Sequence, residues 1–152
     1  MSGEVWQERG TERKDSMARV FRGKVAIPGE EMDAYLEALG QFERDKAPLR
    51  AQLEQYAYDF ARTLAQQYAP KTVRKHTAII ALFVEFLCWQ TDVQHLEEIT
   101  HGMANSAFRQ WYQRKVGDRT ESELKTAVRK FFQFLAQEKG VRNEAVLKSL
   151  QR

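Results

Sequence analysis

The sequence predicts an all-α fold, an orthogonal helical bundle of four to five main helices behind an N-terminal extension. Two segments, residues 72–90 and 120–138, place apolar side chains at steps of three and four residues, the spacing of one helical face. Hydrophobic residues form 43% of the 152-residue chain and charged residues 30%, which suits one globular domain. We expect this helical domain to span residues 30–152 and to follow a mobile or extended arm, residues 1–29.

The expected arm has two parts. Residues 1–16 are polar and charged without periodicity, which predicts a mobile tail. Residues 17–28 alternate loosely between apolar and polar side chains, which favours a short extended segment. Pro28 and Gly29 form a turn signal, so the first helix should begin directly after them.

Two helices are expected before residue 70. The first covers residues 30–45, where acidic side chains fill the first turn and interact favourably with the helix dipole. Pro48 should start a second helix, because proline suits a first helical turn, and its apolar stripe continues to about Tyr68. Pro70 then breaks the pattern, since the residue before a proline avoids the helical basin.

The next two helices are predicted from their caps. Thr72 should cap the helix that runs to Gln90, by accepting a hydrogen bond from a free backbone N–H group. Thr100 should cap a further helix, which we expect to end near Gly117.

The last long helix carries the clearest signals at its ends. Thr120 and Glu123 have the spacing of a capping box, in which each side chain accepts from the other residue's backbone N–H. Gly140 should end this helix in the left-handed conformation, and residues 143–150 should form a short closing helix. The run Phe131, Phe132 and Phe134 could stack on bases, but its helical spacing favours packing in the core.

Composition argues against a membrane partner and a metal site. The charged N-terminus lacks the apolar core of a signal peptide, and no apolar run approaches the ~20 residues of a membrane-spanning helix. The single cysteine, Cys88, suits a reducing compartment, so we expect a cytoplasmic protein. The spacings of Cys88, His95 and His101 match no common zinc signature, so we expect neither a metal nor a cofactor.

Positive charge is concentrated after residue 70. Residues 1–69 contain 10 Lys and Arg against 12 Asp and Glu, whereas residues 70–152 contain 14 against 9. Exposed Lys and Arg usually serve solubility. However, the outward face of the last long helix carries no acid, and Ala78 and Ala81 leave the outward face of the helix from Thr72 low enough for a phosphate backbone. These features favour contact with DNA.

An ordered set of residues carries a resemblance to a known family. It comprises Lys71-Thr72-Val73 with His76, then Leu82, Phe83, Phe86 and Leu87, then residues 96–100, Phe108, residues 124–135, and Lys139-Gly140. Residues 70–150 therefore resemble the core-binding domain of tyrosine recombinases, the SAM-like N-terminal domain of phage integrases. The resemblance implies a four- or five-helix domain that forms half of a clamp around duplex DNA.

The resemblance also implies which positions meet DNA. Two departures from the family pattern stand out, His76 in place of an aromatic residue and the additional acidic helix over residues 30–45. The first leaves the role of His76 open, and the second could be a partner surface or a longer cap on the bundle. With their neighbours on the outward faces, the expected DNA-binding residues are Lys71, Thr72, Arg74, Lys75, Arg119, Thr120, Ser122, Lys125, Thr126 and Arg129.

Catalysis is not expected from this chain. The family's chemistry is implied to lie in a C-terminal domain with a tyrosine nucleophile, paired arginines and a His-x-x-Arg element. None of the three histidines here has an arginine three residues after it, so we expect no catalytic residue, no enzymatic activity and no small-molecule substrate. The five tyrosines lie in helical patterns and are interpreted as packing residues: Tyr35, Tyr56, Tyr58, Tyr68 and Tyr112.

Two functions remain as hypotheses. The first is a DNA-binding module of a site-specific recombinase or integrase, whose partners are double-stranded DNA and a catalytic domain or further recombinase protomers. The alternative is a helical module for protein-protein interaction or oligomerisation, in which the acidic helix over residues 30–45 and the apolar stripes serve a partner. A continuous basic patch would support DNA, and a large exposed apolar patch would support a protein partner.

Overall fold

The computed structural model describes residue 20, residues 29–117 and residues 119–150. This part of the chain contains five α-helices and confirms the predicted all-α fold. The expected arm, residues 1–29, lies outside the described residues apart from Gly29 and Val20, which forms an isolated antiparallel bridge with Thr91. The helices are α2 (Met32–Ala65), α3 (Pro70–Gln90), α4 (Phe108–Lys115), α5 (Glu121–Glu138) and α6 (Glu144–Ser149).

Three short helical segments accompany them. The 3-10 turn η1 (Gly29–Glu31) leads into α2, and the 3-10 turn η2 (Leu96–Glu98) follows α3. The segment η3 (Met103–Ala107) is π-helical and continues directly into α4. No described helix combines the length and apolarity that crossing a membrane requires.

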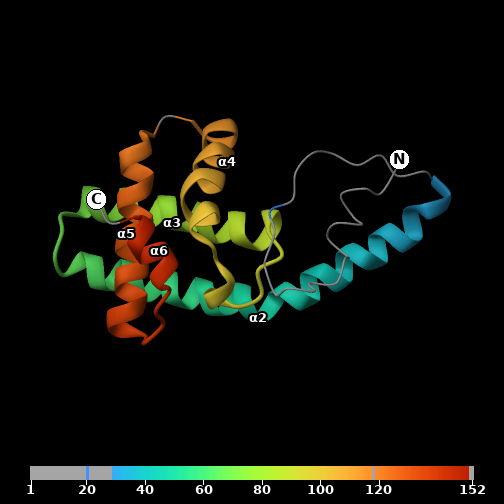
Figure 1. Ribbon diagram of the computed structural model, residues 1–152, viewed down its shortest axis with the longest axis horizontal. Helices are drawn as coiled ribbons and strands as arrows, with labels where there is room; N and C mark the ends of the chain where they lie inside the picture. The colour runs from blue at the N-terminus through green and yellow to red at the C-terminus, as the bar shows by residue number, and fades with distance from the viewer. Residues whose placement is uncertain (1–19, 21–28, 118, 151–152) are drawn as a thin grey trace.

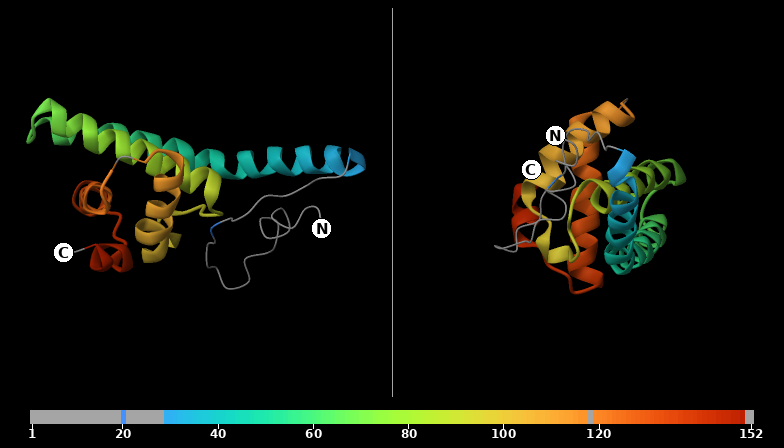
Figure 2. Two further views of the ribbon diagram at one scale, coloured as in Figure 1. Left: turned by 90° about the horizontal axis from the view of Figure 1, so that it is seen from above. Right: turned by 90° about the vertical axis from the view of Figure 1, so that its right-hand side faces the viewer.

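The helices form two layers. Helices α2 and α3 lie side by side, and α5 runs across them (Figure 1). Figure 2 shows α4, α5 and α6 on one side of this pair, while the N-terminal end of α2 extends beyond the other helices. The first buried side chain of α2 is Phe42, so the bundle begins about one third of the way along this helix.

The predicted helix break at Pro48 is wrong. Helix α2 is continuous over 34 residues with Pro48 inside it. Pro48 and Arg44, whose carbonyl loses its helical donor, are both exposed, so the missing hydrogen bond falls on the solvent side. Phe42 and Leu49 are buried on either side of the proline, and this packing keeps the two halves of the helix together.

Phenylalanines from four helices fill the core. Phe60 of α2 meets Phe131 of α5 edge-on, with ring centroids 5.3 Å apart. Phe83 of α3 contacts Phe108 of α4 in the same manner at 5.0 Å. Such edge-on pairs stabilise a core beyond the area they bury. Phe131, Phe132 and Phe134 are all buried, which confirms that this run packs in the core.

Most predicted helix ends are confirmed. Thr120 Oγ1 accepts from Glu123 N at 3.1 Å, and Glu123 Oε1 accepts from Thr120 N at 3.0 Å, which completes the capping box. Gly140 has φ +68°, the left-handed conformation expected after α5. Thr100 Oγ1 accepts from Met103 N at 3.2 Å and so caps the segment that leads into α4.

Thr72 is not a cap. Helix α3 begins at Pro70, with Ala69 as the N-cap residue and no side-chain hydrogen bond to the helix start. The fixed φ of proline suits the first helical position, and proline has no N–H group to leave unpaired there. The N-cap position therefore lies three residues earlier than predicted, and Thr72 lies within the first turn of α3.

Candidate nucleic-acid interface

The first turn of α3 projects a group of basic side chains. Lys71 and Arg74 are exposed and Lys75 is half-buried, since the helix turns its apolar residues toward α2 and α5. The first N–H group bonded within the helix is that of Val73, which donates to the Ala69 carbonyl at 3.0 Å. The amides of Lys71 and Thr72 precede it, and such free groups at a helix start favour anions.

Arg119 reaches this turn from the loop between α4 and α5. Gly117, at φ +74°, lets the chain reverse direction after α4. The carbonyl of Arg119 then accepts from Gln113 Nε2 at 2.8 Å, which ties the loop back to α4. These local features hold Arg119 beside α3, almost 50 residues earlier in the sequence.

Half of the expected DNA-binding residues line one open hollow. Its volume is about 310 Å³. Four of the five lining side chains are cations, and they come from two segments far apart in the sequence. We call these residues the basic hollow: Lys71, Thr72, Arg74, Lys75 and Arg119.

The basic hollow is only partly neutralised. Lys75 forms an ion pair with Glu123, with Nζ and Oε2 3.7 Å apart. Within the described part of the chain, Lys71, Arg74 and Arg119 form no ion pair. The hydrogen bond from the Thr120 backbone, followed by the charges of Lys75 and Arg119, lowers the pKa of Glu123. Glu123 therefore stays charged, but its one carboxylate faces four cations, so the hollow keeps an excess of positive charge.

His76 lies beneath the same charges. Its side chain is 4% exposed, and Nδ1 has no hydrogen-bond partner among the described residues. Burial, followed by the charges of Lys130, Lys75 and Arg119, lowers its pKa from the ordinary 6.5. His76 is therefore a neutral core residue at neutral pH, surrounded by cations of α3, α5 and the loop before α5.

The remaining expected DNA-binding residues lie along α5 and at its start, and they differ in how exposed they are and in whether they already form hydrogen bonds. Ser122 is exposed, and Lys125 and Thr126 are half-buried on the outward side of the helix. The backbone N–H of Thr120 already donates to Glu123, so this helix start is less open to a phosphate than that of α3. Arg129 Nη1 lies 3.5 Å from the Leu150 carbonyl and is thus directed toward the end of α6 rather than toward the hollow.

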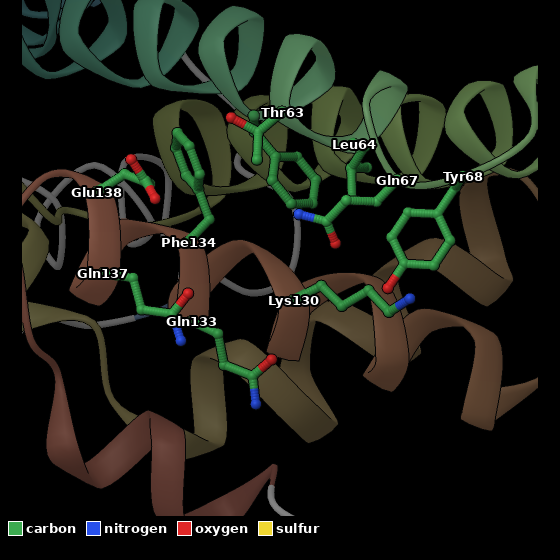
Figure 3. A pocket seen from close by; sticks show the side chains of 10 residues that line it. Thr63, Leu64, Gln67, Tyr68, Lys130, Gln133, Phe134, Gln137 and Glu138 are labelled. Atoms are coloured by element: carbon green, nitrogen blue, oxygen red, sulfur yellow. The ribbon is translucent and has the colours of Figure 1, made fainter.

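A second cationic feature near the start of α3 was not predicted from the sequence. Lys130 Nζ of α5 lies 4.0 Å from the centroid of the Tyr68 ring, in the turn between α2 and α3. Both residues line a pocket of about 130 Å³ between α2 and α5, together with three glutamines. Figure 3 shows Tyr68 and Lys130 beside each other at one end of this pocket and Glu138 at the other.

Two tyrosines differ from their predicted packing role. Tyr112 is buried, in agreement with the prediction, but Tyr58 and Tyr68 are 60% and 38% exposed. Both exposed rings contact cations, Tyr58 with Arg62 at 5.9 Å and Tyr68 with Lys130. The exposure of Tyr58 and Tyr68 was not predictable from helical spacing, because spacing predicts which residues share a helical face but not which faces other helices cover.

The described residues contain no group of three His, Cys, Asp or Glu side chains placed to hold a metal ion. Cys88 is buried, and burial raises the pKa of its thiol. His95 and His101, by contrast, are exposed. Cys88 is therefore an inert packing residue, as thiolate is the reactive form.

Comparison with known proteins assigns most of the helical region to one family. The family model described as phage integrase, N-terminal SAM-like domain, matches residues 55–139. The match spans the end of α2, all of α3 and α4, and α5 to its C-terminal end, so it includes the basic hollow. Neither the curated proteins nor the solved structures gave a match.

Proposed function

This chain belongs to the family of phage integrase N-terminal SAM-like domains, a recombinase-associated family, and we propose that it is the DNA-binding module of a tyrosine site-specific recombinase or integrase. In this proposal the module acts in the cytoplasm, binds duplex DNA through its phosphates and major groove, and positions a catalytic domain or further protomers. It binds DNA without cleaving it, because the family match is to a domain that carries no catalytic residues.

The basic hollow is the observation that carries the proposal. The hollow brings together four cations and a threonine from α3 and from the loop that precedes α5. Three of these cations form no ion pair within the described residues. Unpaired cations beside a helix start are suited to phosphate oxygens, which supply most of the affinity of a DNA-binding protein. Exposed Ala78 and Ala81 continue this surface along α3 with low side chains.

Sequence recognition would rest on fewer residues. Phosphate contacts fix the position of a protein on DNA, whereas contacts to base edges in the major groove distinguish sequences. Arg74, Lys125 and Arg129 are our candidates for base contacts, because long cationic side chains reach guanine edges. Arg129 would first have to leave the Leu150 carbonyl, so its contribution should be the smallest of the three.

Titration of a labelled duplex at two salt concentrations tests the proposal. We expect a dissociation constant of ~10⁻⁴ to 10⁻⁶ M, marked weakening at higher salt, and a duplex that remains uncut. The double substitution Lys71→Glu and Arg74→Glu should abolish binding while helical content stays unchanged. Arg62→Glu, a charge reversal on the outer side of α2, is the control and should have little effect. Absence of binding at low salt, or binding insensitive to salt, would refute the proposal.

A protein partner remains a second candidate because of the projecting part of α2. Its first ten residues contain no buried side chain, and Met32 and Leu36 are 39% and 55% exposed. This part also precedes the family match, which begins at residue 55. If it mediates self-association, sedimentation should depend on protein concentration, and Met32→Ser with Leu36→Ser should remove that dependence. An unchanged monomer at all concentrations would exclude self-association.

A further inference from the structure

The pair formed by Tyr68 and Lys130 lies on the same side of α5 as the basic hollow. Glu123, which pairs with Lys75 of the hollow, precedes Lys130 by seven residues, or nearly two helical turns. Residues at this spacing lie on one helical face, about 10 Å apart along the axis. Lys130 therefore continues the line of positive charge from the hollow toward the turn between α2 and α3.

Lys130 and Tyr68 offer two hydrogen-bond donors without an acidic partner. Among the described residues, the Lys130 ammonium pairs with no carboxylate and the Tyr68 hydroxyl forms no hydrogen bond. The ring face holds the ammonium in place at 4.0 Å from the centroid, while both residues remain partly open to solvent. A lysine held against an aromatic ring loses less freedom on meeting an anion than a mobile surface lysine does.

The chemistry of the surrounding pocket suits a nucleic-acid strand. The neighbouring polar groups are the uncharged amides of Gln67, Gln133 and Gln137. The single carboxylate of the pocket, Glu138, lies at the end opposite Tyr68 and Lys130 (Figure 3). The cationic end can therefore accept a phosphate without repulsion from an adjacent acid.

From this geometry we propose that Lys130 and Tyr68 form a second phosphate-binding point for the duplex that the basic hollow binds. The inference rests on the proposed function and extends its surface across the turn between α2 and α3. The Lys130 ammonium supplies the charge, and the Tyr68 hydroxyl donates to a second oxygen of the same phosphate. Burial, followed by the charges of Lys130, Lys75 and Arg119, lowers the pKa of His76, so Lys130 and two cations of the hollow act on the same buried side chain.

The chain offers a matched control for this pair. Arg62 also lies over an exposed tyrosine, Tyr58, on α2. Helical spacing places Tyr58 and Arg62 on the side of α2 opposite Phe60 and Leu64, which face the core. Removing Arg62 therefore removes one cation and one ring contact without altering the proposed phosphate surface.

The test measures duplex affinity of the full chain at several salt concentrations. Lys130→Gln should weaken binding about three- to tenfold and reduce the slope of log K against log salt by about 0.9, the loss of one phosphate contact. Lys130→Arg should retain the slope. Tyr68→Phe keeps the ring but not the hydroxyl, and should weaken binding about twofold without lowering the thermal midpoint. Arg62→Gln should leave affinity and slope within error of the unsubstituted protein.

The results separate this inference from the proposed function. If Lys71→Glu with Arg74→Glu abolishes binding but Lys130→Gln behaves like Arg62→Gln, the second phosphate point is refuted and the DNA-binding proposal stands. If the unsubstituted chain does not bind duplex DNA at low salt, both are refuted. A loss of affinity in Lys130→Gln with an unchanged salt slope would show that Lys130 acts only by packing, and would also overturn the inference.

Discussion

Replacing Lys46 with methionine should reveal how the C-terminal end of α3 is held to α2. Lys46 is 3% exposed, and its ammonium donates to the carbonyls of Leu87 and Val93 at 2.9 and 2.5 Å. One side chain of α2 thus satisfies two buried acceptors where α3 ends. Methionine preserves most of the apolar stem but removes these two hydrogen bonds and the contact of the ammonium with the Phe42 ring, whose centroid lies 5.5 Å from Nζ. The substitution therefore measures the contribution of the ammonium group.

The expected loss follows from the two acceptors. The Leu87 carbonyl still accepts from the Thr91 hydroxyl at 2.6 Å, so it loses one of two donors. The buried Val93 carbonyl loses the donor that Lys46 supplies, and a buried carbonyl left unpaired costs about 1–3 kcal/mol. Relief from burying a charged group offsets part of this cost. We therefore expect Lys46→Met to lower the free energy of unfolding by about 2 kcal/mol.

Urea denaturation followed by circular dichroism measures this difference. Lys148→Met is the control, because Lys148 is exposed on α6 and its loss should change the free energy of unfolding by less than about 0.5 kcal/mol. Equal stabilities of Lys46→Met and Lys148→Met would refute the reasoning. A variant more stable than the unsubstituted protein would show that desolvation of the ammonium outweighs its hydrogen bonds.

Three further predictions concern acid titration and helix capping. The hydrogen bond from Lys139 lowers the pKa of Asp59 from 3.8, so the carboxylate stabilises the fold above that pH and its contribution disappears as pH falls through the lower folded pKa. Urea titrations should therefore show a smaller acid loss for Asp59→Asn, and identical pH profiles would contradict this. Burial lowers the pKa of His76, so its contribution to stability falls as pH drops below 6.5, and a proton-NMR titration midpoint of 6.5 or higher would be incompatible with its burial. Thr120→Ala removes the acceptor for Glu123 N–H and should cost about 1 kcal/mol in urea denaturation, whereas Thr126→Ala within α5 should cost less.

Local signals were sufficient for helix ends whose partners lie within a few residues. The capping box of Thr120 and Glu123 joins residues only three positions apart. The closing helix expected over residues 143–150 is α6, and its cap at Asn143, which accepts from Val146 N at 3.2 Å, is equally local although it was not predicted. Gly140 needs only its own backbone freedom to end α5. Such features depend on short-range geometry, so they can be predicted from the sequence alone.

Features that depend on distant packing were not predictable from local pattern. The sequence pattern predicts a helix start at Pro48, but buried side chains on both sides of this proline keep α2 continuous. Lys46 looks like a solvent-facing charge within that helix, yet its partners follow 41 and 47 residues later. In each case a tertiary contact outweighs a local preference.

The candidate site shows the same division. Arg119 and the residues at the start of α3 were selected from outward faces and a family resemblance, and the structure brings five of them to one hollow. Lys130 was overlooked because it borders the apolar stripe of α5, and Tyr68 because tyrosine in a helical pattern usually packs. The pairing of Lys130 with Tyr68 depends on the tertiary structure, because the end of α2 lies beside α5 and places the Lys130 ammonium over the Tyr68 ring.

The length of α2 separates the acidic, projecting N-terminal part of this helix from the basic hollow. Acidic residues gather around the N-terminal end of α2, whereas the basic hollow lies near its C-terminal end. A helix of 34 residues is about 51 Å long, and the screening length at physiological salt is about 8 Å. The acidic end is therefore too far away to repel the duplex that we propose for the hollow, so the proposed DNA surface and the candidate protein surface on the projecting part of α2 are compatible in one chain.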